Sequence, residues 1–204
     1  MDPVIKKKRT HYKICVFGDS VTYASYIKDS WFNQLRNYLE SFDNLNVEIF
    51  NLGINGNCST DILNRFEIEA SSRKPNRIVF AFGVNDSAYI LSTGEPITSE
   101  NNFALNIQTL IKKAKYLTTD ITFIGPTLGD DTLLKPFPPS SKGKSFDKER
   151  VNTCNHILKE LALKHECKFI ETINQLNFDD FSDGLHPNQS GHNKLFELIK
   201  TSLE

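Results

Sequence analysis

The chain has 204 residues, of which 39% are apolar and 24% are charged, and its 24 basic and 25 acidic side chains give a formal net charge of -1. This composition is ordinary for a globular protein and excludes collagen-like, coiled-coil and largely disordered chains. The near-zero charge argues against a generalised nucleic-acid-binding surface, and no apolar run approaches the ~20 residues that span a bilayer.

The N-terminal segment is basic, with four positive side chains from Lys6 to Arg9. It lacks the apolar stretch of a secretory signal peptide, so we expect a cytoplasmic protein. The length divided by ~150 residues gives between one and two domains, and one domain is favoured. We therefore expect a flexible terminus at residues 1–11 and a single domain at residues 12–204. Whether the basic cluster has a role of its own stays open.

Apolar periodicity predicts an alternation of strands and helices. In chain order, the pattern predicts a strand at 12–17, a helix at 31–39 capped by Ser30, a strand at 46–52, a helix at 59–74, a strand at 77–82, a loop at 86–99, a helix at 103–114, a strand at 121–124, a loop at 127–145, a helix at 151–165, a strand at 168–170 and a helix at 188–203. This alternation favours a five-stranded parallel sheet with helices on both faces, a three-layer α/β/α sandwich.

Polar and glycine-rich clusters follow three of the predicted strands and precede the last helix. They lie at residues 18–20, 51–57, 83–86 and 183–188. Ligands of parallel α/β sheets bind beyond the carboxyl ends of the strands. We therefore expect these four clusters to meet in one site.

The first and last clusters contain the side chains needed for nucleophilic catalysis. A serine hydroxyl such as Ser20 needs a base, and His186 is a candidate because imidazole titrates near neutral pH. Asp183, three residues earlier, could reach the far ring nitrogen and hold the tautomer. Pro187 disfavours a helical conformation at His186, so we expect the pair on a loop.

The oxyanion of acyl transfer needs donors that are already in position. The backbone N–H groups of Ser20 and Gly56 and the side-chain amide of Asn85 are available at neighbouring strand ends. Each residue also has an ordinary structural explanation, because glycines serve tight turns and an Asp-Ser pair can cap a helix. Four such coincidences at one sheet edge favour the catalytic explanation.

The four clusters together resemble the SGNH hydrolases, also called the GDSL family of esterases and lipases. The matching motifs are Gly-Asp-Ser at 18–20, Gly-Ile-Asn-Gly-Asn at 53–57, Gly-Val-Asn-Asp at 83–86 and Asp-Gly-Leu-His-Pro-Asn at 183–188. Val21 and Ala24 stand where many members have Leu and Gly. Neither departure touches a catalytic role.

This resemblance implies a role for each motif residue. Ser20 is implied as nucleophile and first oxyanion donor, Gly56 as second donor, Asn85 as third, Asp183 as the orienting acid and His186 as the base. The position of Gly53, three residues before Gly56, makes the glycine assignment the least secure. We expect Asp19 and Asp86 to support the site. The resemblance also implies the flavodoxin-like strand order 2-1-3-4-5.

We therefore expect a serine esterase that acts on short-chain, acetyl-type esters of a sugar or another small polar alcohol. An O-acyltransferase, or a lysophospholipase or thioesterase-type acyl hydrolase, could use the same residues, and a non-enzymatic flavodoxin-like or carbohydrate-binding module is the alternative outside enzymes. No cofactor, metal or nucleic-acid partner is expected, and a homodimer stays open. The two long loops are expected to border the pocket with Tyr89, Asp130, Asp131, Lys135 and Phe137.

The four cysteines contain no Cys-x-x-Cys pair, the spacing of zinc ribbons and thioredoxin-like sites. We expect unpaired thiols that act as small buried hydrophobes. Cys58 lies two residues after Gly56, and for it simple packing is favoured over a role at the site.

Overall fold

The computed structural model describes residues 11–42 and 46–203. Most of the expected flexible basic terminus lies outside the described residues. Strand β1 includes His11, the last residue assigned to that terminus.

The main sheet has five parallel strands in the order β2-β1-β3-β5-β7. These strands are β1 (His11–Gly18), β2 (Asn46–Gly53), β3 (Arg77–Ala81), β5 (Asp120–Ile124) and β7 (Lys168–Ile170). Counted along the chain, the order of these strands is 2-1-3-4-5, which confirms the expected flavodoxin-like arrangement. The register places Gly18 of β1 beside Gly53 of β2 and Ala81 of β3. The carboxyl ends of three strands therefore meet at one edge.

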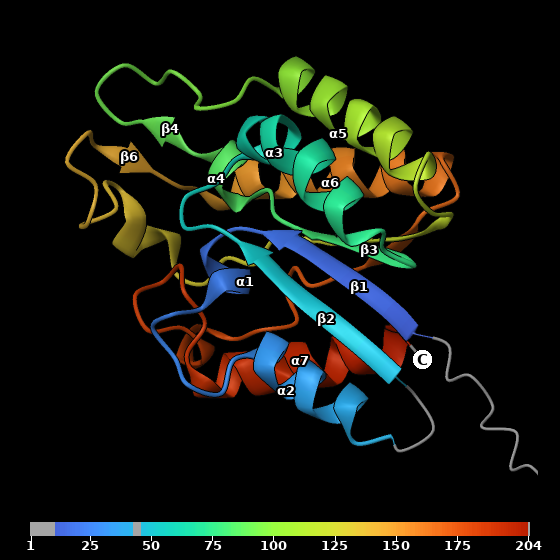
Figure 1. Ribbon diagram of the computed structural model, residues 1–204. Coiled ribbons are helices and arrows are strands. Elements are labelled where there is room, and N and C mark those ends of the chain that lie inside the picture. The colour runs from blue at the N-terminus through green and yellow to red at the C-terminus, as the bar shows by residue number, and fades with distance from the viewer. Residues whose placement is uncertain (1–10, 43–45, 204) are drawn as a thin grey trace, which may run out of the picture.

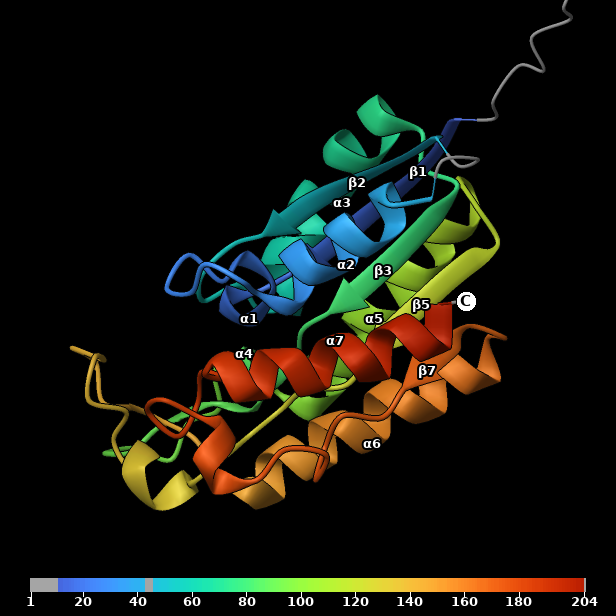
Figure 2. The ribbon, with the colours of Figure 1, turned by 90° about the horizontal axis from the view of Figure 1, so that it is seen from below.

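Helices cover both faces of this sheet, as Figures 1 and 2 show. One face carries α3 (Ser59–Arg73), α5 (Glu100–Lys115) and α6 (Lys148–Lys164), and the other carries α2 (Trp31–Glu40) and α7 (Gln189–Leu203). Phe17, Phe66 and Phe80 lie in the core of the first face, and Trp31 and Leu195 in that of the second. The three-layer sandwich is thus confirmed. Because both faces are covered, strands such as β1 are continuous apolar runs.

Helix starts deviate from the apolar pattern where the first turn is polar. Helix α5 begins at Glu100, after the capping side chain of Ser99, and α6 begins at Lys148, after that of Asp147. Both begin three residues before the first predicted helical residue. Polar residues after an N-cap favour the first helical turn but leave no apolar periodicity to detect. No helix in the described ranges is long and apolar enough to cross a membrane.

The two segments expected to be loops contain short regular elements. The first holds part of α4 (Val84–Ser87) and β4 (Tyr89–Ile90), and the second holds the 3-10 helix η1 (Asp131–Leu134) and β6 (Lys144–Ser145). Strands β4 and β6 pair antiparallel, with Tyr89 opposite Ser145 and Ile90 opposite Lys144. The prediction of plain loops was therefore wrong in part. Two-residue strands are too short to show a period of two.

A small third core anchors these segments to the domain. It contains the buried side chains of Val84, Ala88, Leu134, Phe146, Val151 and Leu185. These residues come from α4 and the residue after it, η1, the residue after β6, the start of α6 and the chain before α7. The remaining short elements are α1 (Ser20–Tyr23) and the 3-10 helix η2 (Phe178–Asp180).

Candidate active site

Ser20 is the first residue of α1, directly beyond the carboxyl end of β1. The side chain of Asp19 caps this one-turn helix by accepting a hydrogen bond from the Val21 N–H at 3.0 Å. A β-carbon at Gly18 would collide with the Thr22 side chain and with the Ala81 carbonyl of β3. The tight strand-to-helix turn that positions Ser20 therefore requires glycine at residue 18.

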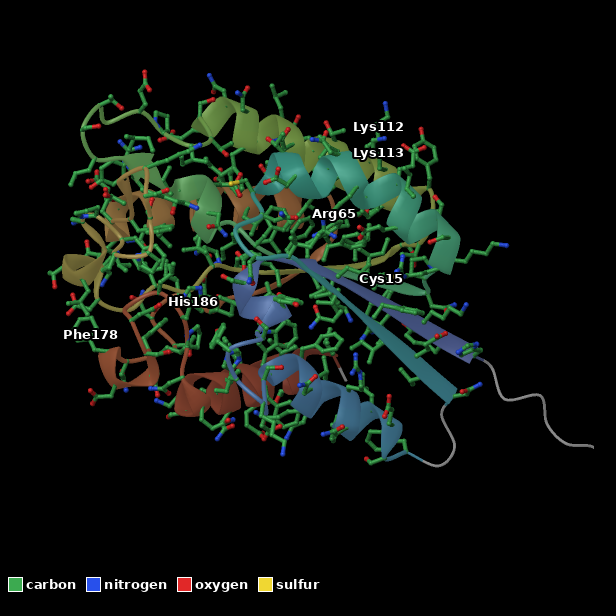
Figure 3. All side chains as sticks on the ribbon, turned by 60° about the vertical axis from the view of Figure 1, so that its left-hand side comes forward. Cys15, Arg65, Lys112, Lys113, Phe178 and His186 are labelled. Atoms are coloured by element: carbon green, nitrogen blue, oxygen red, sulfur yellow. The ribbon has the colours of Figure 1, made fainter. Side chains whose placement is uncertain are left out.

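Ser20, His186 and Asp183 form a continuous hydrogen-bonded array. Ser20 Oγ lies 3.0 Å from His186 Nε2, and His186 Nδ1 lies 2.8 Å from Asp183 Oδ2. In Figure 3, His186 lies beyond the carboxyl ends of β1 and β2. The structure thus joins residues 166 positions apart in the chain in the arrangement that the sequence predicts.

The loop before α7 holds Asp183 in place through its own backbone. Asp183 Oδ1 accepts hydrogen bonds from the N–H groups of Leu185 at 3.0 Å and His186 at 2.7 Å. Gly184, with φ +84°, permits this tight turn. Partial burial acts to raise the pKa of Asp183, but the hydrogen bonds from His186 and Leu185 outweigh it and keep the pKa below its ordinary value. Asp183 is therefore a carboxylate at neutral pH. Asp183 and His186 both lie on a loop, as the sequence predicts.

Gly56 and Asn85 line the same cleft as Ser20 and His186. The buried Asn85 side chain donates through Nδ2 to Asn57 O at 3.3 Å and to Asp19 Oδ2 at 3.5 Å. Its Oδ1 accepts a hydrogen bond from Lys144 Nζ at 2.7 Å. The amide oxygen is thus firmly held, whereas both contacts of the amide nitrogen are long.

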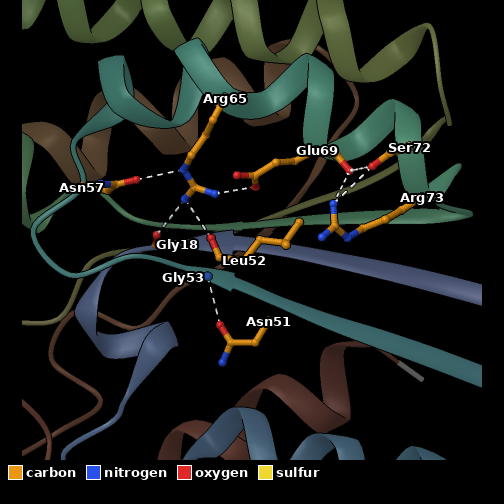
Figure 4. Close-up of polar contacts among 9 residues, drawn as sticks. All are labelled: Gly18, Asn51, Leu52, Gly53, Asn57, Arg65, Glu69, Ser72 and Arg73. Atoms are coloured by element: carbon orange, nitrogen blue, oxygen red, sulfur yellow. Dashed lines mark hydrogen bonds and ion pairs between the residues drawn. The ribbon is translucent and has the colours of Figure 1, made fainter.

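The structure distinguishes Gly53 from Gly56. The Gly53 N–H donates to Asn51 Oδ1 at 2.9 Å, and Gly53 is buried next to β1 (Figure 4). Gly56 has φ +75° and open space around it, and it lines the cleft. Only Gly56 of these two glycines therefore faces the space beside Ser20.

Arg65 of α3 ties together the strand ends that carry the site, as Figure 4 shows. Its Nη2 donates to Leu52 O at 2.7 Å and Gly18 O at 3.3 Å, and its Nε donates to Asn57 Oδ1 at 2.9 Å. Sequence reasoning missed this residue. Its one detectable signal is Glu69, four residues later, which by itself indicates an ordinary helix ion pair.

Two buried carboxylates lie behind the cleft. Asp19 is 2% exposed and Asp86 is 1% exposed. Burial raises the pKa of each to about 6. Asp86 accepts hydrogen bonds from the N–H and hydroxyl of Ser59, so it connects α4 to the first turn of α3. Asp19 and Asp86 thus make hydrogen bonds with the backbone that carries the site, and their supporting role stays a prediction.

Removing the Asp86 charge is expected to change how stability depends on pH. The pKa of Asp86 is about 6 in the folded protein against 3.8 ordinarily, because burial disfavours the charged form. The protonated carboxyl group therefore contributes its full stabilisation of the fold below about pH 4, and this stabilisation is lost as the pH rises through 6. Relative to Asp86→Asn, the wild type should lose up to about 3 kcal/mol of unfolding free energy between pH 4 and pH 7. Urea denaturation at both pH values measures this difference. Parallel pH curves for the two proteins would contradict it.

The cleft walls agree only in part with the expected loop residues. Phe137 lines the cleft, but Tyr89, Asp130, Asp131 and Lys135 are absent from its lining. Asp130 caps η1, Asp131 pairs with Lys135, and Tyr89 packs beneath Arg150. These side chains were predicted wrongly because they stabilise the loops internally.

Three side chains that sequence reasoning missed line the cleft instead. They are Tyr26, Lys144 and Phe146. Together with the polar groups they surround a volume of about 1190 Å³, which includes the solvent at its open mouth. Lys144 shows no ion pair with a described carboxylate, and burial lowers its pKa. Its Nζ lies beside Asn85, to whose Oδ1 it donates a hydrogen bond.

The four cysteines are buried and unpaired, as predicted. Burial raises the pKa of Cys58 to about 12, so its thiol stays protonated at neutral pH. Within the described ranges, no group of three or more His, Cys, Asp or Glu side chains could hold a metal ion.

A serine, an imidazole and a carboxylate in this geometry, at the carboxyl edge of a parallel sheet, define the chain as a hydrolase of the serine type. It belongs to the GDSL-like lipase/acylhydrolase family, whose model matches residues 16–194. This result confirms the resemblance seen in the four motifs.

Three individual proteins that resemble the chain share between 17% and 32% sequence identity with it over the aligned segments. The chain is 32% identical over 113 residues to the uncharacterized lipoprotein YqeF of Bacillus subtilis, a match that spans 52% of this chain and 45% of that protein. A catalytic mutant of an acetylxylan esterase from Geobacillus stearothermophilus has the same fold, with a TM-score of 0.76, 17% identity and 94% of each chain covered. A lipase/acylhydrolase from Enterococcus faecalis superposes with a TM-score of 0.75 and 22% identity, over 94% of this chain and 95% of that one.

Proposed function

We propose that this protein is a serine esterase that hydrolyses short-chain esters, above all acetyl esters, of a sugar or another small polar alcohol. The observation that carries the proposal is the 3.0 Å hydrogen bond between Ser20 Oγ and His186 Nε2, with Asp183 at 2.8 Å from the far ring nitrogen. A hydroxyl bonded to an oriented imidazole can lose its proton as it attacks a carbonyl.

In the first half of the proposed reaction, His186 takes the proton of Ser20 while Oγ attacks the ester carbonyl carbon. The carbonyl oxygen becomes an oxyanion, held by the N–H groups of Ser20 and Gly56 and by Nδ2 of Asn85. To donate, Asn85 exchanges one of its two long contacts for the oxyanion. The bond to the alcohol then breaks, and the alcohol leaves with the proton from His186.

In the second half, water replaces the alcohol. His186 takes a proton from this water, whose oxygen attacks the acyl-Ser20 carbonyl. Cleavage of the acyl–Oγ bond releases the acid and returns the proton to Ser20. Asp183 stays ionised throughout and stabilises the imidazolium, for which its lowered pKa is suited.

The composition of the cleft supports a small polar ester. Ser25, Asn55, Lys144 and Ser182 contribute polar groups next to the aromatic rings of the lining. Polar groups at this position can form hydrogen bonds with the hydroxyls of a polar alcohol, and such bonds fix the orientation of a small ligand. The likeness in fold to an acetylxylan esterase supports the same choice.

Acetate and decanoate esters of one alcohol test the acyl preference. We expect kcat/KM to be at least about tenfold higher for the acetate, with Ser20→Ala as the background for each substrate. A preference for decanoate would contradict the short-chain proposal and leave the esterase intact. If the folded wild type hydrolyses neither ester, the esterase proposal itself is wrong.

A further inference from the structure

His192 of α7 is completely buried and its hydrogen bonds define where its proton lies. Its Nδ1 lies 3.2 Å from the backbone nitrogen of Trp31. A backbone amide can only donate, so Nδ1 is the acceptor and carries no proton. The ring is therefore neutral, with its single proton on Nε2. Burial, which lowers the pKa of His192 to about 4, agrees with this state.

The position of this proton determines the role of the Tyr26 hydroxyl. His192 Nε2 lies 3.0 Å from Tyr26 Oη, and because Nε2 carries the proton, the tyrosine oxygen accepts the hydrogen bond. The hydroxyl keeps its own proton, since burial and then the charges of Asp19 and Asp183 raise the pKa of Tyr26 well above its ordinary value. This O–H has no acceptor in the part of the chain that the structure describes. Tyr26 thus presents an oriented, unused donor.

Tyr26 lies beside the imidazole that is proposed to protonate the departing alcohol. It lines the cleft with Ser20, and its ring packs against the imidazole of His186, with centroids 5.1 Å apart. Phe137 contacts the same imidazole, at a centroid distance of 6.1 Å. The group that protonates the leaving oxygen is therefore flanked by two rings, one of which carries a free donor. Asn85 and Gly56 line the same cleft, and the carbonyl oxygen is proposed to bind to them.

We propose that Tyr26 binds the alcohol part of the substrate by donating its O–H to an oxygen next to the ester, such as the neighbouring hydroxyl of a sugar. This inference rests on the proposed esterase function. It defines the substrate class as esters of alcohols with an acceptor oxygen on the adjacent carbon. Buried His192 acts as a positioning residue, because it occupies one side of the hydroxyl oxygen and directs the proton into the cleft.

A matched pair of acetates tests this role. The two substrates are cyclohexyl acetate and the monoacetate of trans-1,2-cyclohexanediol, which differ by one adjacent hydroxyl. Tyr26→Phe should lower kcat/KM about 3- to 10-fold for the diol monoacetate, the value of one neutral hydrogen bond, and less than about twofold for cyclohexyl acetate. Tyr23→Phe is the matched control, because Tyr23 is 49% exposed and outside the cleft lining, and it should change neither rate.

The outcomes separate this inference from the esterase proposal. Equal losses on both acetates, or no loss on either, would overturn the role of Tyr26 while leaving the esterase in place. A folded wild type that hydrolyses neither acetate would overturn both. The nitrogen NMR shifts of His192 in the wild type give a second test that needs no variant: we expect a protonated Nε2 and a bare Nδ1, and the opposite tautomer would refute the argument.

Discussion

Replacing Ser20 by alanine is expected to lower kcat for ester hydrolysis by about 10⁶-fold, the loss typical of removing the nucleophile from a Ser-His-Asp array. Ser20 Oγ is the one atom of the array placed to attack, 3.0 Å from the imidazole that takes its proton. The change removes a single oxygen from a side chain that is 9% exposed, so the fold should be retained. Steady-state hydrolysis of an acetate ester measures the effect.

Ser41→Ala is a matched control for this variant. Ser41 caps the end of α2, where its hydroxyl donates to the Tyr38 carbonyl at 2.7 Å, far from the cleft. It should retain wild-type activity. A fluorophosphonate probe adds a direct test, because it should label the wild type and the Ser41 variant but leave Ser20→Ala unlabelled. Equal labelling of Ser20→Ala and the wild type would refute the assignment of the nucleophile.

Replacing Asn85 by alanine is expected to lower kcat about 10²- to 10³-fold with little change in KM. The amide hydrogen bond to the oxyanion forms only as negative charge develops, so its loss affects the transition state more than the bound ester. Asn85 is 4% exposed and its oxygen is already held by Lys144. Parallel measurements of kcat, KM and thermal unfolding separate catalysis from folding.

Asn102→Ala is the control for this effect. Asn102 lies in the first turn of α5, is exposed and is absent from the cleft lining. It makes the same change of side chain and should leave kcat within about twofold of the wild type, as surface substitutions usually do. An Asn85→Ala enzyme with wild-type kcat would exclude the side chain from the oxyanion hole.

The sheet and the core of the site could be predicted because they depend on local patterns. Apolar runs ending in glycine, such as the one before Ser20, mark buried strands, and parallel strands place their carboxyl ends at one edge. That rule was enough to bring Ser20, Gly56 and Asn85 together before any contact was known. The short spacing between Asp183 and His186 made their contact a local property of one turn.

The residues that escaped prediction act through contacts with no local signature. Arg65 binds backbone carbonyls of two strands, and any residue type supplies a carbonyl. Tyr26 depends on His192, 166 positions away, and Lys144 meets Asn85 across 59 positions. Such pairs are set by the packing of whole elements, which a single sequence does not show. The prediction that the charged loop residues line the cleft was wrong for the opposite reason. Near neighbours such as Asp131 and Lys135 form an ion pair with one another.

The pairing of β4 with β6 means that the two walls of the cleft form one mechanical unit. Strand β4 belongs to the segment after Asn85, and β6 carries Lys144, so a change of register between the strands would carry the ammonium away from the amide that it holds. An insertion in either segment would therefore change the positions of both segments. To transfer a new substrate preference onto this scaffold, an engineer would have to exchange the two segments together as a single cassette, leaving the five-stranded sheet and its serine untouched.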